Sequence, residues 1–286
     1  MKLGLGTAQF GQAYGIANKL ESVSAETATA IISSAASNHI DLIDTASCYG
    51  DCALLLGLAN VSNFEVVTKL PGLPENTSNP AQWAREMIAG SLHRLNIPSV
   101  SGLHLHRPSE ILGIHGDLLY QTLSNEKAAG RISKLGISVY SPDELETIMQ
   151  RYPFDLVQVP CNIIDRRFIE SGWFERLKTA NVEVHVRSVF LQGLLLMKTL
   201  PVYFDRWQEK FQNWHEWLAD NSKDPVDACL GFLKAIPQID RIIVGAVSVA
   251  QLEHIARCFQ QSTGYQIPDI ASTDEALVNP SLWQLS

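Results

Sequence analysis

Four kinds of ionisable side chain stand at or just after the ends of three successive apolar segments near the start of the chain. They are an aspartate, a tyrosine, a lysine and a pair of histidines: Asp44, Tyr49, Lys69, His104 and His106. A carboxylate, a phenol, an ammonium and an imidazole can donate, accept and stabilise protons. Each alone is more often structural, since a lysine at a strand end is usually a solvated charge and one histidine of such a pair usually packs in the core. Together they indicate acid–base chemistry, provided that the fold brings them to one place.

The elements that must position these side chains are eight short apolar segments. They are rich in Val, Ile and Leu, which is typical of parallel strands covered on both faces. The predicted strands are residues 3–8, 40–46, 64–70, 100–106, 132–138, 154–160, 182–188 and 241–246.

Amphipathic segments between these strands predict helices. Ser24 is a plausible N-cap for a helix to about Asn38, and Ser141 for one that follows it. The predicted helices after the first are residues 79–95, 142–150, 167–180, 225–235 and 249–260. An extra helix is expected within 189–224, where Trp207, Phe211, Trp214 and Trp217 recur at helical spacing. Packing explains these aromatic residues more readily than substrate contact does, although an apolar or sugar-stacking wall is the alternative.

Eight strands, each with a helix or room for one behind it, predict an α/β fold of the (β/α)8 TIM barrel type. A doubly wound sheet would place a Gly-x-Gly-x-x-Gly turn after one of its first strands. Here Gly4, Gly6 and Gly11 lie in or just after the first strand, with no predicted helix opening on them. Because active sites of such barrels lie at the carboxyl ends of the strands, the ionisable residues are expected at the barrel mouth.

Composition excludes several classes of partner. The formal net charge of -8 argues against nucleic acid and anionic membranes, which attract basic surfaces. No apolar run is long enough to span a membrane, and the first residues lack the apolar segment of a signal peptide. Five scattered cysteines indicate reduced thiols and a cytoplasmic protein. Cys48 and Cys52 lack a second pair at metal-binding spacing, so no metal site is expected.

The ordered set of strand-end motifs resembles the aldo-keto reductase superfamily. The motifs are LGLGTAQFG, DTASCYG (44–50), VVTKL (66–70), LHLHRP (103–108), LGISVYS (135–141), VQVPCNIIDRR (157–167), VRSVFLQGLLL (186–196) and IIVGAVSVAQL (242–252). The resemblance covers nearly the whole chain and looks like the shorter bacterial members. It implies one barrel domain over residues 1–286, and a cytoplasmic oxidoreductase that transfers hydride between NAD(P)H and a small carbonyl substrate.

By this resemblance Asp44, Tyr49, Lys69 and His106 correspond to the family's catalytic tetrad. Tyr49 would be the proton donor, and Lys69 would lower its pKa because a nearby ammonium stabilises the phenolate. Asp44 would hold Lys69, and His106 would orient the carbonyl oxygen. His106 is preferred over His104 because the family's histidine stands two residues before the proline, here Pro108.

The resemblance also implies a cofactor site. Ser138 and Gln158 would bind the nicotinamide carboxamide, and Arg187 would stack beneath the ring. The segment after Arg187 would lie along the pyrophosphate, and the segment after the last strand would bind the adenosine phosphate. The full set of expected cofactor residues is Gly6, Thr7, Ser138, Gln158, Arg187, Ser188, Phe190, Gln192, Gly193, Gly245, Ala246, Ser248 and Gln251.

The chain departs from the family pattern at several of these positions. Val139 stands where an asparagine is usual, and Ala53 where a glutamate touches the adenine side. No Lys or Arg stands at Gly245, Val247 or Gln251 to clamp a 2′-phosphate, and His254 replaces a common acidic residue. Ser248 with its helix N-terminus could still bind an anion. NADPH is therefore the family's expectation, with NADH possible.

The sequence leaves two other functional hypotheses open. One is a nicotinamide-nucleotide-binding barrel without turnover, acting as a sensor or partner subunit. The other is a redox-neutral enzyme, either a lyase with a Schiff base on Lys69 or an epimerase. Neither the carbonyl substrate nor the oligomeric state is readable from the sequence, although family habit favours a monomer or a weak homo-oligomer.

Overall fold

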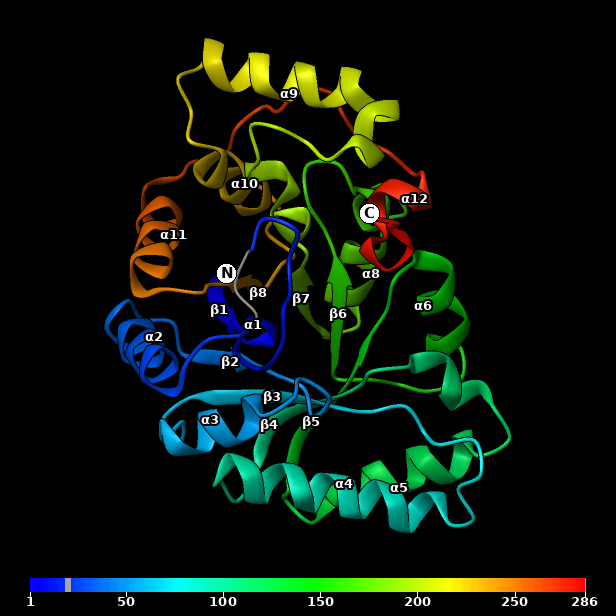
Figure 1. The fold of residues 1–286 in the computed structure, drawn as a ribbon. Helices are drawn as coiled ribbons and strands as arrows, with labels where there is room; N and C mark the ends of the chain where they lie inside the picture. Colours follow the sequence, from blue (N-terminus) through cyan, green and yellow to red (C-terminus); the bar gives the residue numbers. More distant parts are fainter. Residues whose placement is uncertain (19–21, 286) are drawn as a thin grey trace.

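Eight parallel strands close into a barrel in their sequence order, in a computed structural model that describes residues 1–18 and 22–285 (Figure 1). The strands are β1 (Lys2–Gly6), β2 (Leu42–Asp44), β3 (Glu65–Leu70), β4 (Val100–Leu105), β5 (Ile132–Ser138), β6 (Leu156–Pro160), β7 (Glu183–Arg187) and β8 (Arg241–Gly245). Each predicted strand is present, to within two residues at either end. The (β/α)8 fold predicted from the sequence is confirmed.

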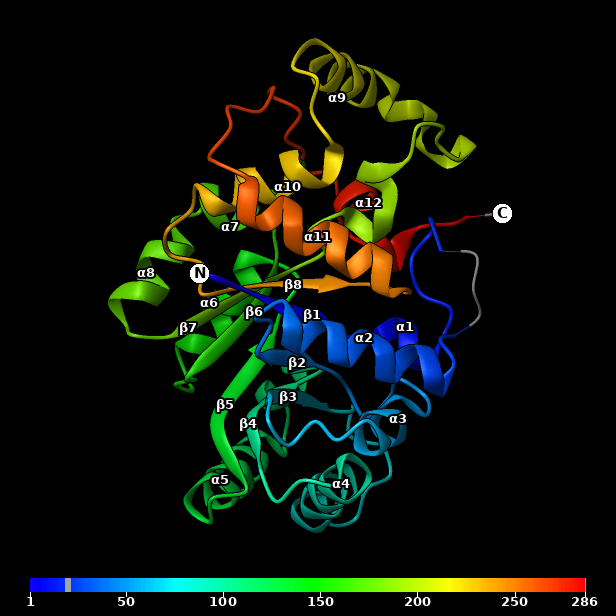
Figure 2. The same cartoon turned by 90° about the vertical axis from the view of Figure 1, so that its left-hand side faces the viewer.

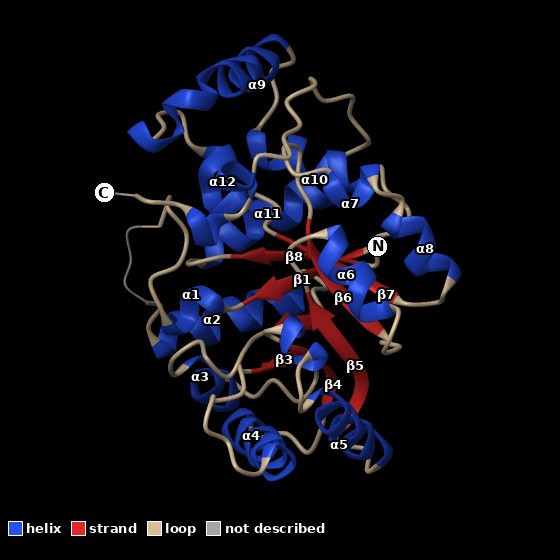
Figure 3. Ribbon diagram, turned by 90° about the vertical axis from the view of Figure 1, so that its right-hand side faces the viewer, coloured by secondary structure: helices blue, strands red, loops and turns tan. Residues whose placement is uncertain are grey.

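Helices surround this barrel, and Figures 2 and 3 show the strands enclosed between helices from two opposite sides. The α-helices are α1 (Ala8–Gly11), α2 (Ala25–Ser37), α3 (Cys52–Leu58), α4 (Pro80–Leu95), α5 (Gly116–Ala128), α6 (Pro142–Met149), α7 (Arg167–Glu170), α8 (Trp173–Thr179), α9 (Gln208–Asp220), α10 (Pro225–Lys234), α11 (Val249–Gln261) and α12 (Glu275–Val278). Four short 3-10 helices are η1 (Pro108–Leu112), η2 (Leu191–Leu196), η3 (Val202–Trp207) and η4 (Pro280–Leu282). None of the described helices is long and apolar enough to cross a membrane.

Side-chain caps fix the starts of several helices. Ser24 accepts a hydrogen bond from the backbone N–H of Thr27, and Ser141 accepts one from Glu144, as their positions in the sequence predict. Asn79 caps α4 in the same way, by accepting from Gln82. These caps satisfy N–H groups that have no partner within the helix, and they set where each helix leaves its strand.

The predicted helix at 167–180 is wrong in one respect, because it is two helices. Gly172 lies between α7 and α8 with φ +71, a left-handed conformation that ends the first helix. Four further α-helices, α1, α3, α5 and α12, were not predicted. Helix α1 directly follows β1, where the sequence analysis expected no helix. Helices α1, α3 and α12 have four to seven residues, too few for a periodic pattern, and α5 begins after His115 without a side-chain cap.

Two apolar clusters outside the barrel lumen hold the helices in place. The larger joins the outer faces of the strands to the helices around them. The second joins Phe204, Phe211 and Trp214 to Ile270 and Leu277 from the C-terminal segment. In Figures 1 and 2, α9 lies outside the ring of helices, beyond α10 and α12. Its buried aromatic residues serve packing, as the sequence favoured, and none of them lines the barrel mouth.

Candidate active site

Strand alternation determines which side chains reach the barrel mouth. Leu42, Val67, Leu156 and Ile243 form a separate apolar cluster, which fills the barrel lumen. Because successive strand residues face opposite sides, the residues two positions later also point inward. For these strands they are Asp44, Lys69, Gln158 and Gly245. With their counterparts Gly6, His106, Ser138 and Arg187, they line one cavity of about 400 Å³. The inward-facing positions at this end of the barrel thus contribute eight of the seventeen predicted site residues.

A buried ion pair lies at the floor of this cavity. Lys69 Nζ donates to Asp44 Oδ2 at 2.6 Å and to the backbone oxygen of Thr45 at 3.1 Å. Only 2% of the Lys69 side chain and 8% of that of Asp44 are exposed. Gln158 Nε2 donates to the other carboxylate oxygen of Asp44 at 2.8 Å, and Ser138 Oγ donates to Gln158 Oε1 at 3.4 Å. The predicted carboxamide-binding pair therefore forms a single network with the ion pair.

Tyr49 lies above this pair, with Lys69 Nζ 5.5 Å from the centre of its ring. Burial raises the pKa of Tyr49 well above its usual value of 10, and the Asp44 carboxylate raises it further, whereas the Arg187 guanidinium lowers it. The expectation that Lys69 depresses this pKa is not met. The physical reason is that Asp44 balances the charge of Lys69, which leaves burial to dominate. Tyr49 is consequently a protonated phenol at neutral pH.

The structure separates the two histidines. His106 lines the cavity, with its ring edge-on to that of Tyr49 and the two ring centres 6.3 Å apart. Burial, with Lys69 and Arg187 nearby, lowers the pKa of His106 to about 4, so its imidazole is neutral at pH 7. His104 is fully buried one layer below, beside His185, and does not reach the cavity. The geometry thus favours His106 over His104, as the sequence motif does.

Arg187 lies on the opposite wall of the cavity. Its guanidinium lies 4.3 Å from the centre of the Tyr140 ring and donates to the backbone oxygen of Val139 at 3.3 Å. Val139 is fully buried, and its apolar side chain has no donor or acceptor for the polar contact that an asparagine would make. Arg187 therefore presents a flat cation to the cavity, held between an aromatic ring and a backbone carbonyl.

The segment that follows Arg187 has an unusual backbone. Ser188, Leu191, Gln192 and Gly193 all have positive φ, between +47 and +91. At Gly193 a Cβ would come within 2.6 Å of Ala17 Cβ, so a glycine is needed where the loop after β7 meets the loop after β1. Ser188, Phe190, Gln192 and Gly193 all line the cavity. Four left-handed residues in one short segment mark a strained loop, which is common at ligand sites.

The last predicted segment reaches the cavity only in part. Gly245, Val247 and Gln251 line it, whereas Ala246 is buried in the outer core. Ser248 caps α11 by accepting from the backbone N–H of Gln251. The Gln251 side chain accepts from the N–H of Val247 at 2.8 Å, so both polar side chains are engaged with their own helix. Contacts of Ala246 and Ser248 with a cofactor stay predictions.

Several cavity residues were not singled out from the sequence. They are Gln9, Gln12, Tyr14, Cys48 and Tyr140. Tyr14 as a whole is 37% exposed, yet burial around its phenol raises its pKa. Cys48 Sγ lies 3.3 Å from His106 Nδ1. Gln9, Gln12 and Tyr14 follow β1, whereas Cys48 follows β2 and Tyr140 follows β5, and no motif in the sequence marked these positions as site residues.

Comparison with known proteins agrees with this geometry. The family model described as "Aldo/keto reductase family" matches residues 2–275. An aldo-keto reductase from Bacillus halodurans in its holo form has a similar structure, with TM-score 0.75, 21% identity, and 94% of this chain and 89% of that chain covered.

A glycerol dehydrogenase from Gluconobacter oxydans is also similar, with TM-score 0.71, 22% identity, and 91% of this chain and 86% of that chain covered. At such identities the likeness establishes the fold alone. A search of curated proteins found no match to the sequence.

Proposed function

The chain belongs to the aldo/keto reductase family, and from that premise we propose that it transfers hydride between NAD(P)H and a small carbonyl compound, with Tyr49 as the proton donor. The observation that carries the proposal is the protonated Tyr49 phenol over the buried Lys69–Asp44 pair at the barrel mouth. We also propose that residues 1–286 form one domain. Other members of the fold share its architecture without sharing its chemistry, so the argument rests on the site.

The residues present fit a nicotinamide nucleotide. Gly6 and Gly245 pair across β1 and β8, which leaves backbone rather than side chains on that part of the cavity wall. A Cβ at Gly245 would come within 2.4 Å of the Gln9 amide, so a larger residue there would displace the Gln9 side chain that shares this wall. Ser138 and Gln158 offer amide and hydroxyl partners for a carboxamide, and Arg187 offers a cation. A bound nicotinamide would supply the hydride.

Tyr49 would complete the reaction by proton transfer. The carbonyl carbon gains the hydride, and its oxygen gains the phenolic proton, which leaves a tyrosine anion to be reprotonated from solvent. Lys69 has three N–H donors and uses two of them on Asp44 and Thr45. The third is available to the phenolate, so Lys69 would stabilise the negative charge as it develops on Tyr49.

His106 would orient the carbonyl oxygen as a neutral donor. The thiol of Cys48, 3.3 Å from Nδ1, can donate to that nitrogen and so fix the tautomer that carries hydrogen on Nε2. The Nε2–H group would then donate to the substrate oxygen. Because His106 is uncharged at pH 7, this role needs no change in its protonation.

The decisive test compares wild type with Tyr49→Phe. Both proteins would be titrated with NADPH and with NADH, followed by energy transfer from tryptophan to the bound nicotinamide. Both would then be assayed with a panel of aldehydes and ketones. Equal nucleotide affinity, with turnover about 10² to 10⁴ times slower in Tyr49→Phe, is the expected result, because only the proton donor has been removed. The affinity ratio of the two nucleotides identifies the preferred cofactor.

The rival functions predict other results. Tight nucleotide binding without turnover of any carbonyl would indicate a sensor or partner subunit. A covalent adduct on Lys69, trapped with borohydride, would indicate a Schiff-base lyase. Net conversion without oxidation of free cofactor would indicate an epimerase. The ion pair of Lys69 with Asp44 disfavours the lyase, since a Schiff base requires a free amine.

A further inference from the structure

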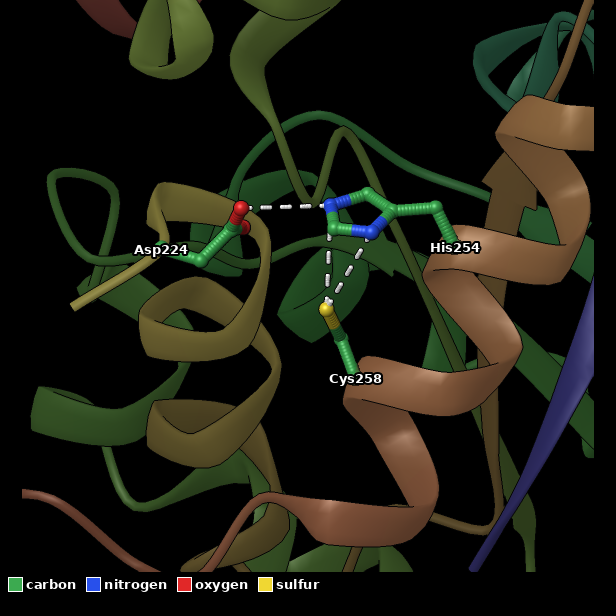
Figure 4. Close-up of side chains that lie close together, drawn as sticks. All are labelled: Asp224, His254 and Cys258. Carbon is green, nitrogen blue, oxygen red and sulfur yellow. Dashed lines mark hydrogen bonds and ion pairs between the residues drawn. The ribbon is translucent and has the colours of Figure 1, made fainter.

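Two helices outside the barrel bring together a carboxylate, an imidazole and a thiol. Asp224 stands at the start of α10, and His254 and Cys258 lie one turn apart on α11 (Figure 4). His254 Nε2 lies 3.2 Å from Asp224 Oδ2, and Cys258 Sγ lies 3.8 Å from the same nitrogen. One donor atom from each residue falls within 4.8 Å of the others. None of the three lines the cavity at the barrel mouth.

These separations suit a tetrahedral metal ion. Zinc binds imidazole and carboxylate at about 2.0 to 2.2 Å and thiolate at about 2.3 Å, so its ligand atoms lie about 3.2 to 3.9 Å from one another. The Nε2–Oδ2 and Nε2–Sγ distances already fall in this range. The remaining pair, Sγ and Oδ2, needs to close by at most about 1 Å, which side-chain rotation can supply.

The contacts around the cluster leave the three ligand atoms able to bind a metal ion. Asp224 caps α10 with Oδ1, which accepts from the N–H groups of Val226 and Asp227, so the cap does not use Oδ2, the oxygen that faces His254 Nε2. His254 and Cys258 are four residues apart, which places both on the same face of α11. Asp224 is exposed and His254 is half-buried, so ions can enter from solvent, whereas Cys258 forms a buried floor.

From this geometry we propose a zinc site formed by Asp224, His254 and Cys258, with water as the fourth ligand. A thiolate and an imidazole favour Zn²⁺ over Mg²⁺ or Ca²⁺, which prefer sets of oxygen ligands. The ion joins α10 to α11 near the start of α10. Lys234, at the end of α10, already donates to the carbonyls of Phe259 and Ser262 beyond the other end of the cluster. Zinc would therefore link these two helices at a second point along their length.

A nucleophilic Cys–His–Asp triad is the competing interpretation of the same residues, and the geometry disfavours it. Cys258 Sγ lies almost equally far from both ring nitrogens, at 3.8 and 3.9 Å, rather than in a directed hydrogen bond with one of them. Cys258 is also only 6% exposed, which leaves no approach for a substrate carbonyl. A metal ion requires neither feature.

The test measures metal binding directly and does not depend on reductase activity. Untagged full-length protein is stripped with a chelator and titrated with Zn²⁺ against a competing chromophoric chelator, and with Co²⁺ by absorption. We expect one ion per chain, a near-ultraviolet charge-transfer band from thiolate to cobalt, and a higher melting temperature with zinc. Asp224→Asn, His254→Gln and Cys258→Ser should each weaken zinc binding by at least about tenfold.

The controls separate this site from other histidines and thiols. Asn retains the N-cap in Asp224→Asn, so that variant should fold normally even if Cys258→Ser does not. His93→Gln, an exposed histidine on α4, and Cys48→Ser, the exposed thiol, should bind zinc as wild type does. The proposal is overturned by no saturation below about 100 µM, by an unchanged cobalt band in Cys258→Ser, or by loss of binding in either control.

Discussion

Lys69 and Asp44 are two buried charges that offset each other's cost of burial. Each has lost its water, and their contact at 2.6 Å, with Gln158 on the second carboxylate oxygen, replaces it. Removing one partner leaves the other uncompensated, whereas removing both leaves no buried charge. This makes the pair a structural unit as well as the proposed activator of Tyr49.

For this pair we predict strong non-additivity. Lys69→Met should lower the free energy of unfolding by about 3 to 5 kcal/mol, because the Asp44 carboxylate stays buried without a cation. The double variant Asp44→Leu/Lys69→Met should recover more than half of that loss. Urea unfolding of wild type, both single variants and the double variant gives the coupling energy. Additive effects would show that the pair is not coupled in this way.

The same residue scale shows where sequence reasoning fell short. A lysine beside a tyrosine predicts a lowered phenol pKa, yet burial raises the pKa of Tyr49. The sequence identifies which charges are close, but it does not give the degree of desolvation, which opposes them. Cys48 was missed as a partner of His106 for a related reason, since residues 58 positions apart meet only through the barrel.

At the scale of elements, α9 and its neighbours form the second apolar cluster. Trp214 is fully buried there, and its indole N–H donates to the backbone oxygen of Leu195 at 3.0 Å. Leu195 belongs to η2, whose first turn contains Gln192 and Gly193 at the cavity wall. The helix outside the ring thus supports the strained loop of the candidate site.

Trp214→Phe should therefore affect stability through one hydrogen bond. The variant keeps an aromatic ring but leaves the Leu195 carbonyl without its partner, which we expect to cost about 1 to 3 kcal/mol in unfolding free energy. Trp217→Phe on the same helix is the matched control, since among the described residues its indole N–H makes no hydrogen bond to the loop, and it should cost less. Urea unfolding of both variants decides the point. An equal loss in the two variants would mean that packing alone, and not the bond to Leu195, matters.

At the scale of the whole molecule, the two ends of the barrel differ in kind. The carboxyl ends of the strands contain the cavity, whereas the amino ends contain partly buried ion pairs such as Arg241 with Asp41 and Glu65, and Lys134 with Glu183. This division is usual for the fold, in which one face serves catalysis and the other stability.

Stability should fall on acidification, and His106 should account for part of the loss. Its pKa is about 4 in the folded protein and about 6.5 when unfolded, so only the unfolded state gains a proton as pH falls through that window. The contribution is intact above pH 6.5 and disappears toward pH 4. Glu183, with a folded pKa of about 2, adds a loss in the same direction between pH 4.5 and 2.

The measurement is urea unfolding of wild type and His106→Gln at pH 7 and pH 4.5. Wild type should lose about 2 kcal/mol more than the variant between these pH values, after allowance for the partial exposure of His106. His104 is present in both proteins and cancels from the comparison. An identical loss in the two proteins would show that His106 does not titrate with a depressed pKa.

The sequence by itself determined the strands, the barrel and most of the candidate site. Strand patterns are local, so Asp44 and Lys69 could be assigned to one mouth once the barrel is assumed, and the family resemblance added Gln158, Arg187 and the choice of His106 over His104. The tertiary structure alone decided how strongly Tyr49 is desolvated and that Trp214 supports the loop after β7. It also brought Asp224 to His254 and Cys258. These features depend on contacts between distant segments, whose closeness and burial no local pattern encodes.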